Sequence, residues 1–149
     1  MVASPAAAHA TAGDTANICA SSPAPSGWVD TSWYYLSSCG TSTFSNNAHR
    51  IKQIAGYTAG TTVSACSSSP APSGWVDTSW YYLSSCGTYT FSNNAHNIKQ
   101  IAGYTVGTTV SACSSSPAPS GWVDTSSYYL SSCGTYTFSN NAHNIKRVY

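Results

Sequence analysis

One histidine and one aspartate recur through this chain with a period of 47 residues. They are His49, His96 and His143, and Asp30, Asp77 and Asp124. Together with a serine, such a pair could form a hydrolytic triad, but no Gly-x-Ser-x-Gly elbow marks a nucleophile. Glutamate is absent, so a glycosidase would need carboxylates from two different copies. We therefore predict that the protein is not an enzyme, and the Asn-Asn-Ala-His context predicts a histidine in a solvated turn.

A metal site would require the three histidines to converge on a three-fold axis. That arrangement needs copies that close into a ring, whereas turn histidines point to solvent. Nucleotide-binding loops and basic clusters are both absent. We expect no metal, no cofactor and no nucleic-acid partner.

An aromatic cluster beside the aspartate is the best candidate for a binding site. The candidate residues are Trp33, Tyr35, Trp80, Tyr82 and Tyr129. The third copy has a serine where the others have tryptophan, which indicates an accessible position. Tryptophan and tyrosine beside short polar groups suit sugars, and several weak sites in one chain reinforce one another. The alternative is that these rings simply fill three small cores.

The composition is that of a protein from an oxidising environment. Charged residues make up 6% of the 149 residues, against roughly 25% in an average soluble protein, and the net charge is +1. Six cysteines without a Cys-x-x-Cys pair favour disulfides. Without an apolar run of about 18 residues, no transmembrane segment is expected. We predict a secreted, extracellular protein.

The chain consists of three near-identical copies of one unit. The phrase Ser-Ser-Pro-Ala-Pro-Ser-Gly-Trp-Val-Asp-Thr-Ser begins at positions 21, 68 and 115. We place the repeats at 13–56, 60–103 and 107–149. Residues 1–12 are Ala-rich with Ala-x-Ala spacing and are interpreted as a signal-peptide remnant; the alternative is a disordered leader.

The cysteines follow the same frame, which suggests one disulfide inside each copy. The predicted pairs are Cys19–Cys39, Cys66–Cys86 and Cys113–Cys133. A shifted scheme, 39–66 and 86–113, would leave the outer two cysteines unpaired unless the ends of the chain meet.

Alternation and turn residues predict strands in each copy. In the middle copy, residues 61–66 alternate with Val63 and Ala65 on the inner face. Residues 75–83 form the second predicted strand, with Trp75 inside, Val76 outside and Asp77 on the buried side, where a bulge or a turn would accommodate it. Residues 87–91 form a short third strand. Residues 95–102 fit a strand better than a helix, although both spacings are present.

These elements predict an all-β protein of three tandem small disulfide-stapled units. The alternative is one closed three-fold body resembling a β-trefoil, in which the first strand would pair with the last. Separate units are favoured because a local disulfide in every copy suits a self-sufficient unit.

The phrase Cys-x-x-Ser-Pro-x-Pro-Ser-Gly-Trp-Val, followed by a second cysteine and an Asn-x-Ile segment, resembles tandem repeats of secreted bacterial proteins. The likeness covers most of each copy and implies secretion and repetition, with no activity attached. We predict a secreted, non-catalytic protein that binds glycans or a cell surface multivalently. The alternative function is self-assembly, with copies of the chain as partners in an extracellular fibre, coat or adhesin.

Overall fold

The computed structural model describes residues 10–40, 45–87, 92–134 and 138–149 and is all-β, as predicted. Each copy contributes three strands and one short 3₁₀ turn. The first copy holds β1 (Thr15–Cys19), β2 (Trp28–Tyr34), η1 (Ser37–Cys39) and β3 (Ala48–Gln53). The second holds β4 (Thr62–Cys66), β5 (Trp75–Tyr81), η2 (Ser84–Cys86) and β6 (Ala95–Gln100). The third holds β7 (Thr109–Cys113), β8 (Trp122–Tyr128), η3 (Ser131–Cys133) and β9 (Ala142–Arg147).

Each copy forms its own three-stranded antiparallel sheet, with the last strand of the copy in the centre. The orders are β1-β3-β2, β4-β6-β5 and β7-β9-β8. A disulfide in each copy links the end of the first strand to the 3₁₀ turn, and all three pairs are those predicted. Among the described residues, β1 pairs only with β3, and β9 pairs with β7 and β8. The chain is therefore three tandem units, and the closed three-fold body is not formed.

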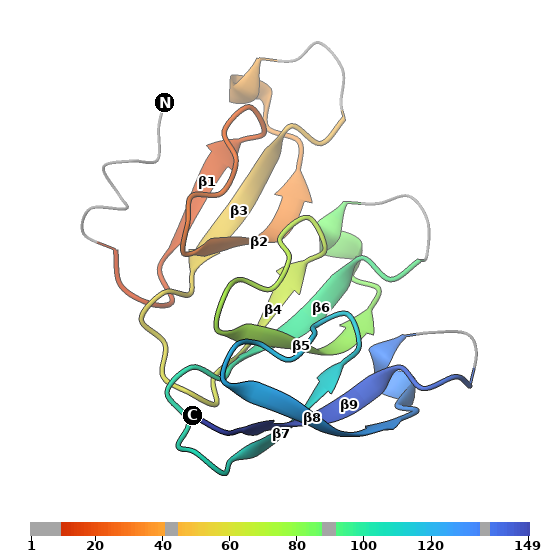
Figure 1. Cartoon of the computed structure of the whole chain (residues 1–149). Coiled ribbons are helices and arrows are strands. Elements are labelled where there is room, and N and C mark those ends of the chain that lie inside the picture. The colour runs from red at the N-terminus through yellow and green to blue at the C-terminus, as the bar shows by residue number, and fades with distance from the viewer. Residues whose placement is uncertain (1–9, 41–44, 88–91, 135–137) are drawn as a thin grey trace.

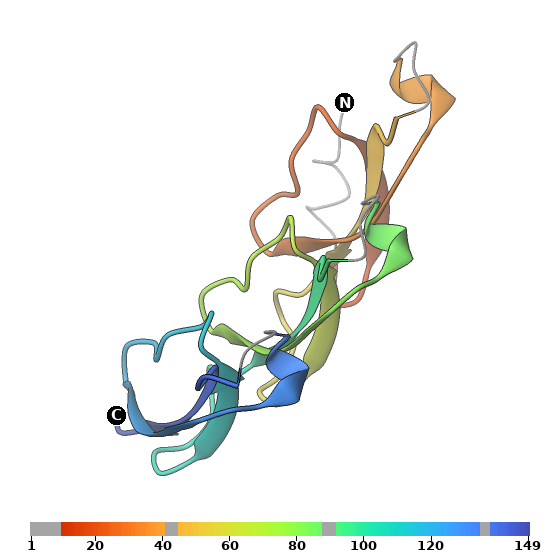
Figure 2. The same cartoon turned by 90° about the vertical axis from the view of Figure 1, so that its right-hand side faces the viewer.

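The three sheets stack one behind another in a single row from the N-terminus to the C-terminus (Figure 1). The Pro-rich loops project from one side of this stack and the 3₁₀ turns from the opposite side (Figure 2). Equivalent loops therefore lie next to each other along one side. No helix among the described residues is long and apolar enough to cross a bilayer.

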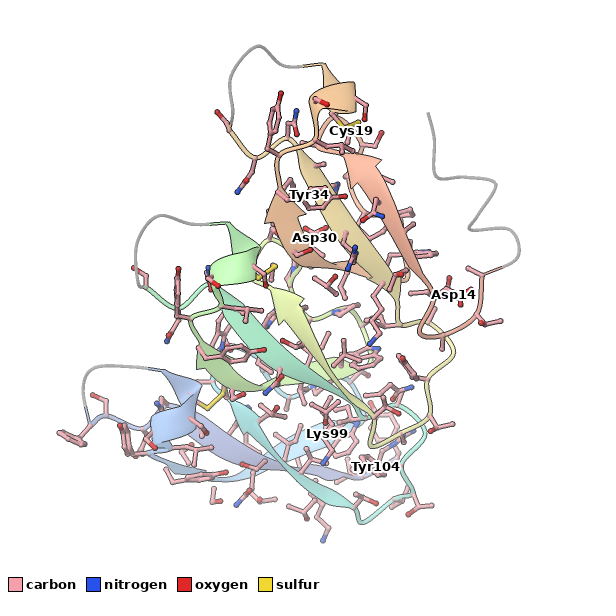
Figure 3. All side chains as sticks on the ribbon, turned by 180° about the vertical axis from the view of Figure 1, so that it is seen from behind. Asp14, Cys19, Asp30, Tyr34, Lys99 and Tyr104 are labelled. Atoms are coloured by element: carbon pink, nitrogen blue, oxygen red, sulfur yellow. A yellow bond between two sulfur atoms is a disulfide. The ribbon has the colours of Figure 1, made fainter. Side chains whose placement is uncertain are left out.

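The hydrophobic cores extend across the junctions between copies. Val29 and Ile54 of the first copy pack with Val63, Trp75 and Ile98 of the second. An equivalent cluster joins the second copy to the third. Side chains fill the space between successive sheets (Figure 3). Because each copy completes the core of the next, the stack is built like a repeat protein whose units depend on nearest-neighbour contacts.

Burial on both sides explains where the strand predictions succeed and fail. Val63 and Ala65 are buried as expected. Trp75, Val76 and Asp77 are consecutive and all buried, so the prediction that Val76 faces outward was wrong: the next copy covers that face. The pairing register shifts between Asp77 and Ser79, which fits the bulge, one of the two alternatives that the sequence left open there. The third predicted strand at 87–91 lies largely outside the described residues.

The last segment of each copy is a strand, as favoured by the sequence. In the middle copy it is β6, which pairs with β4 on one side and with β5 on the other. This central position sets the histidine of each copy in the middle of its sheet.

Candidate functional site

The recurring histidines are buried side chains in the central strand of each sheet. His49, His96 and His143 are 2%, 1% and 7% exposed. The prediction of a solvated turn was wrong, because the Asn-Asn pair precedes the central strand and the histidine already lies within it. Each histidine faces the aspartate of its own copy, at 2.5–2.6 Å from Nδ1 to Oδ1.

The hydrogen bonds define how many protons each pair carries. In the middle copy, His96 Nε2 lies 2.8 Å from the carbonyl oxygen of Ser69, which can only accept. Nδ1 lies 2.6 Å from a carboxylate oxygen of Asp77, so a second hydrogen lies between these two atoms. The pair therefore shares one hydrogen between the ring and the carboxyl group, in addition to the hydrogen on Nε2. Trp80 stacks on the imidazole at 4.4 Å between ring centroids.

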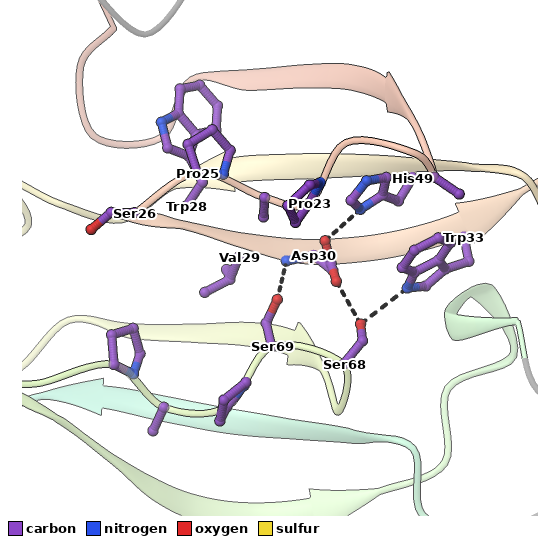
Figure 4. Close-up of a pocket in the computed structure, with 16 residues that line it drawn as sticks. Pro23, Pro25, Ser26, Trp28, Val29, Asp30, Trp33, His49, Ser68 and Ser69 are labelled. Atoms are coloured by element: carbon purple, nitrogen blue, oxygen red, sulfur yellow. Dashed lines mark hydrogen bonds and ion pairs between the residues drawn. The ribbon is translucent and has the colours of Figure 1, made fainter. Parts of the chain in front are cut away.

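The aspartate also binds the following copy (Figure 4). Asp30 Oδ2 accepts a hydrogen bond of 2.6 Å from Ser68 Oγ, and the Asp30 backbone N–H donates to Ser69 Oγ at 2.8 Å. Ser68 Oγ in turn accepts from Trp33 Nε1 at 3.0 Å. Asp30 thus joins the buried histidine of its own copy to two serines of the next.

The same contacts recur at the second junction. Asp77 accepts from Ser115 Oγ at 2.5 Å, and its backbone N–H donates to Ser116 Oγ at 2.7 Å. The Ser116 carbonyl then accepts from His143 Nε2 at 2.8 Å. We call this chain of histidine, aspartate and serine pairs the polar ladder; it runs through all three copies.

The ladder favours the ionised form of its central carboxyl group. Burial alone would raise the pKa of Asp77, but hydrogen bonds from His96, Ser115 and Ser116 and the charge of His96 more than offset it. The pKa of Asp77 lies below its ordinary value as a result.

In the third copy, the aspartate keeps its histidine contact but not the contacts with serines. The side chain of Asp124 is 62% exposed, against 6% for Asp30 and for Asp77. Asp124 still pairs with His143, and among the described residues no serine bonds to its carboxylate as Ser68 bonds to Asp30. Ser127, which replaces the tryptophan here, is exposed.

The predicted binding residues separate into two groups. Trp33 and Trp80 are half-buried at the two junctions, where each stacks on a histidine and donates to a serine of the next copy. Tyr35, Tyr82 and Tyr129 are half-buried beyond the ends of β2, β5 and β8 and line neither of the two grooves described below. The ring of Tyr129 lies 5.3 Å from that of Phe138.

A groove opens between the Pro-rich loops of successive copies (Figure 4). The groove at the first junction has a volume of about 510 Å³ and the one at the second about 380 Å³. Pro23 and Pro25 form one wall of the first groove and Pro70 and Pro72 the other, with Trp33 at the inner end. Volumes of this size are ordinary for small-ligand sites.

The arrangement does not match a hydrolytic triad, although serine, histidine and aspartate meet. In a triad the serine hydroxyl is bonded to the histidine, which removes its proton. Here Ser68 is bonded to the aspartate, and both nitrogens of His49 are already engaged. No group of three potential metal-binding side chains occurs within the described ranges.

The serines were the residues that sequence reasoning missed. Ser68 and Ser69 stood in a phrase interpreted only as a loop. The position of Asp77 on the inward-facing side of its strand could have indicated them. A buried carboxylate requires hydrogen-bond donors, and the serines that recur in every copy could donate these bonds. Comparisons of the chain with protein families, curated proteins and solved structures found no match.

Proposed function

We propose that this chain is a secreted, non-catalytic protein that binds an extended, uncharged polymer, such as a glycan, in the grooves between its copies. The observation that carries the proposal is the recurrence of one groove, with equivalent walls, at both junctions. Binding at several equivalent grooves along one ligand would multiply weak affinities.

The groove linings favour a neutral ligand. Proline, alanine and serine form the walls, and no lysine or arginine lines either groove. The one carboxylate at the floor of each groove is already bonded to histidine and serine. A sugar ring could contact the proline walls and the exposed edge of Trp33, while the wall serines offer hydroxyls.

Three features support a non-catalytic, extracellular role. The histidines have no free nitrogen for proton transfer, because a carboxylate and a carbonyl occupy both. All six cysteines are paired, which fits an oxidising compartment. The polar ladder serves to hold the walls of the grooves at a fixed spacing.

A glycan array and pull-down on insoluble polysaccharides test the proposal. Ser26→Arg and Ser73→Arg each place a bulky cation on an exposed groove wall. We expect each single variant to lose about tenfold or more in apparent affinity for a dense glycan surface, and the double variant to lose binding. Thr62→Arg, exposed on β4 and outside both grooves, is the matched control. Absence of binding to every glycan, or equal binding by the double variant, would refute the proposal.

A further inference from the structure

The outer face of the third copy exposes the same groups that form a junction elsewhere in the stack. On the third copy, Val123 and Val148 are 44% and 42% exposed and the side chain of Asp124 is 62% exposed. The equivalent side chains of the middle copy are 1%, 1% and 6% exposed, because the third copy covers them. The apolar and polar groups that hold copies together are thus present and uncovered at this end.

The N-terminal face of the first copy carries the other half. Ser21 and Ser22 occupy the positions of the ladder serines; the first is exposed and the second half-buried. Ile18 and the Cys19–Cys39 disulfide are half-buried, whereas their counterparts in the next two copies are mostly buried.

A glycine marks the place where one copy fits against the next. A Cβ added at Gly87 would lie 2.9 Å from the Cβ of Trp33 and closer still to Asn46, which donates to the Gly87 carbonyl at 3.2 Å. The preceding copy therefore fits directly against this glycine. At the equivalent Gly40, no described residue lies within 4 Å of an added Cβ.

We propose that the C-terminal face of one chain docks on the N-terminal face of a second copy, reproducing the junction that the chain already forms twice within itself. Asp124 would bond to Ser21 and Ser22 of the second copy, and Asn140 would reach Gly40. This contact joins two different faces, so it leaves one free face at each end and extends into a linear filament. It does not depend on any ligand in the grooves.

The substitution at position 127 makes this junction weaker than the internal ones. Trp33 and Trp80 each donate to a serine of the next copy and pack against its disulfide. Ser127 supplies neither contact, so association between chains is reversible while the internal junctions stay closed.

Sedimentation velocity of the full chain over a range of concentrations tests the proposal. We expect the sedimentation coefficient to rise with concentration, and Ser127→Trp to lower the apparent dissociation constant by about tenfold or more, equivalent to about 1.4 kcal/mol. Asp124→Arg and Ser21→Arg each alter one exposed end and should each leave a monomer. Thr62→Arg should associate like the parent chain.

Mixing the two blocked variants separates this arrangement from any other. Asp124→Arg retains a free N-terminal face and Ser21→Arg a free C-terminal face, so together they should form a one-to-one dimer that neither forms alone. Circular dichroism confirms that each variant is folded. The proposal would be overturned if the Ser127→Trp chain stayed monomeric at all concentrations, or if the two blocked variants formed no dimer on mixing. It would also be overturned if a chain that carries both Asp124→Arg and Ser21→Arg still associated with itself.

Discussion

Replacing Asp77 by alanine separates the contribution of the junction from that of the histidine pair. Asp77 accepts hydrogen bonds from His96 at 2.6 Å and from Ser115 at 2.5 Å, and its side chain is 6% exposed. Hydrogen bonds to a charged group contribute about 1.5–3 kcal/mol each, and removing one partner of a buried pair costs about 3–5 kcal/mol. We expect Asp77→Ala to lower the free energy of unfolding by about 4 kcal/mol, or the melting temperature by about 10 °C.

Asp124→Ala is the matched control within the same chain. Asp124 has the same histidine partner but a side chain that is 62% exposed and bonded to no following copy. Water replaces its contacts, so the expected loss is about 1 kcal/mol. Denaturant unfolding, followed by tryptophan fluorescence in dilute solution, measures both variants. Equal losses would refute the reasoning, because they would mean that the serines of the next copy contribute nothing.

Three further outcomes follow from the same structure. Folding lowers the pKa of the Asp77 carboxyl group, so the unfolded chain binds this proton more tightly than the folded chain does. The stabilisation of the fold by the ionised carboxylate is complete above about pH 5 and is lost as the pH falls below about 4. Asp77→Ala should therefore flatten a plot of unfolding free energy against pH in that range. Trp80→Ser should cost about 2 kcal/mol in the unfolding free energy, whereas Ser127→Trp should leave it nearly unchanged in dilute solution. Replacing Cys66 and Cys86 together by serine should cost about 3 kcal/mol in a denaturant titration, and an unchanged midpoint would contradict a stabilising role for the staple.

The fold class and the disulfides could be predicted because they depend on signals inside one copy. The cysteine spacing repeats with the frame of the copy, and alternation at Val63 and Ala65 marks a strand whatever lies outside it. An aspartate on a buried face indicated an irregularity near Asp77, although it did not distinguish a bulge from a turn. None of these requires knowledge of how one copy sits on the next.

The site was harder to predict because it lies between copies that are far apart in sequence. A strand pattern assumes one buried face, so Val76 was assigned to solvent although the next sheet covers it. Ser127 was interpreted as evidence that the tryptophan position is exposed in every copy. The structure gives another physical reason: Trp33 and Trp80 pack on the disulfide of the following copy, whereas Ser127 is exposed.

Native-state hydrogen exchange at the backbone amides of Asp30, Asp77 and Asp124 tests most directly that the copies form one stack closed by the polar ladder. The first two amides donate to Ser69 and Ser116 across a junction, whereas the third belongs to Asp124, whose side chain is 62% exposed. In dilute solution, the amides of Asp30 and Asp77 should exchange only on global unfolding, and that of Asp124 far faster. Equal exchange rates at all three would contradict the account.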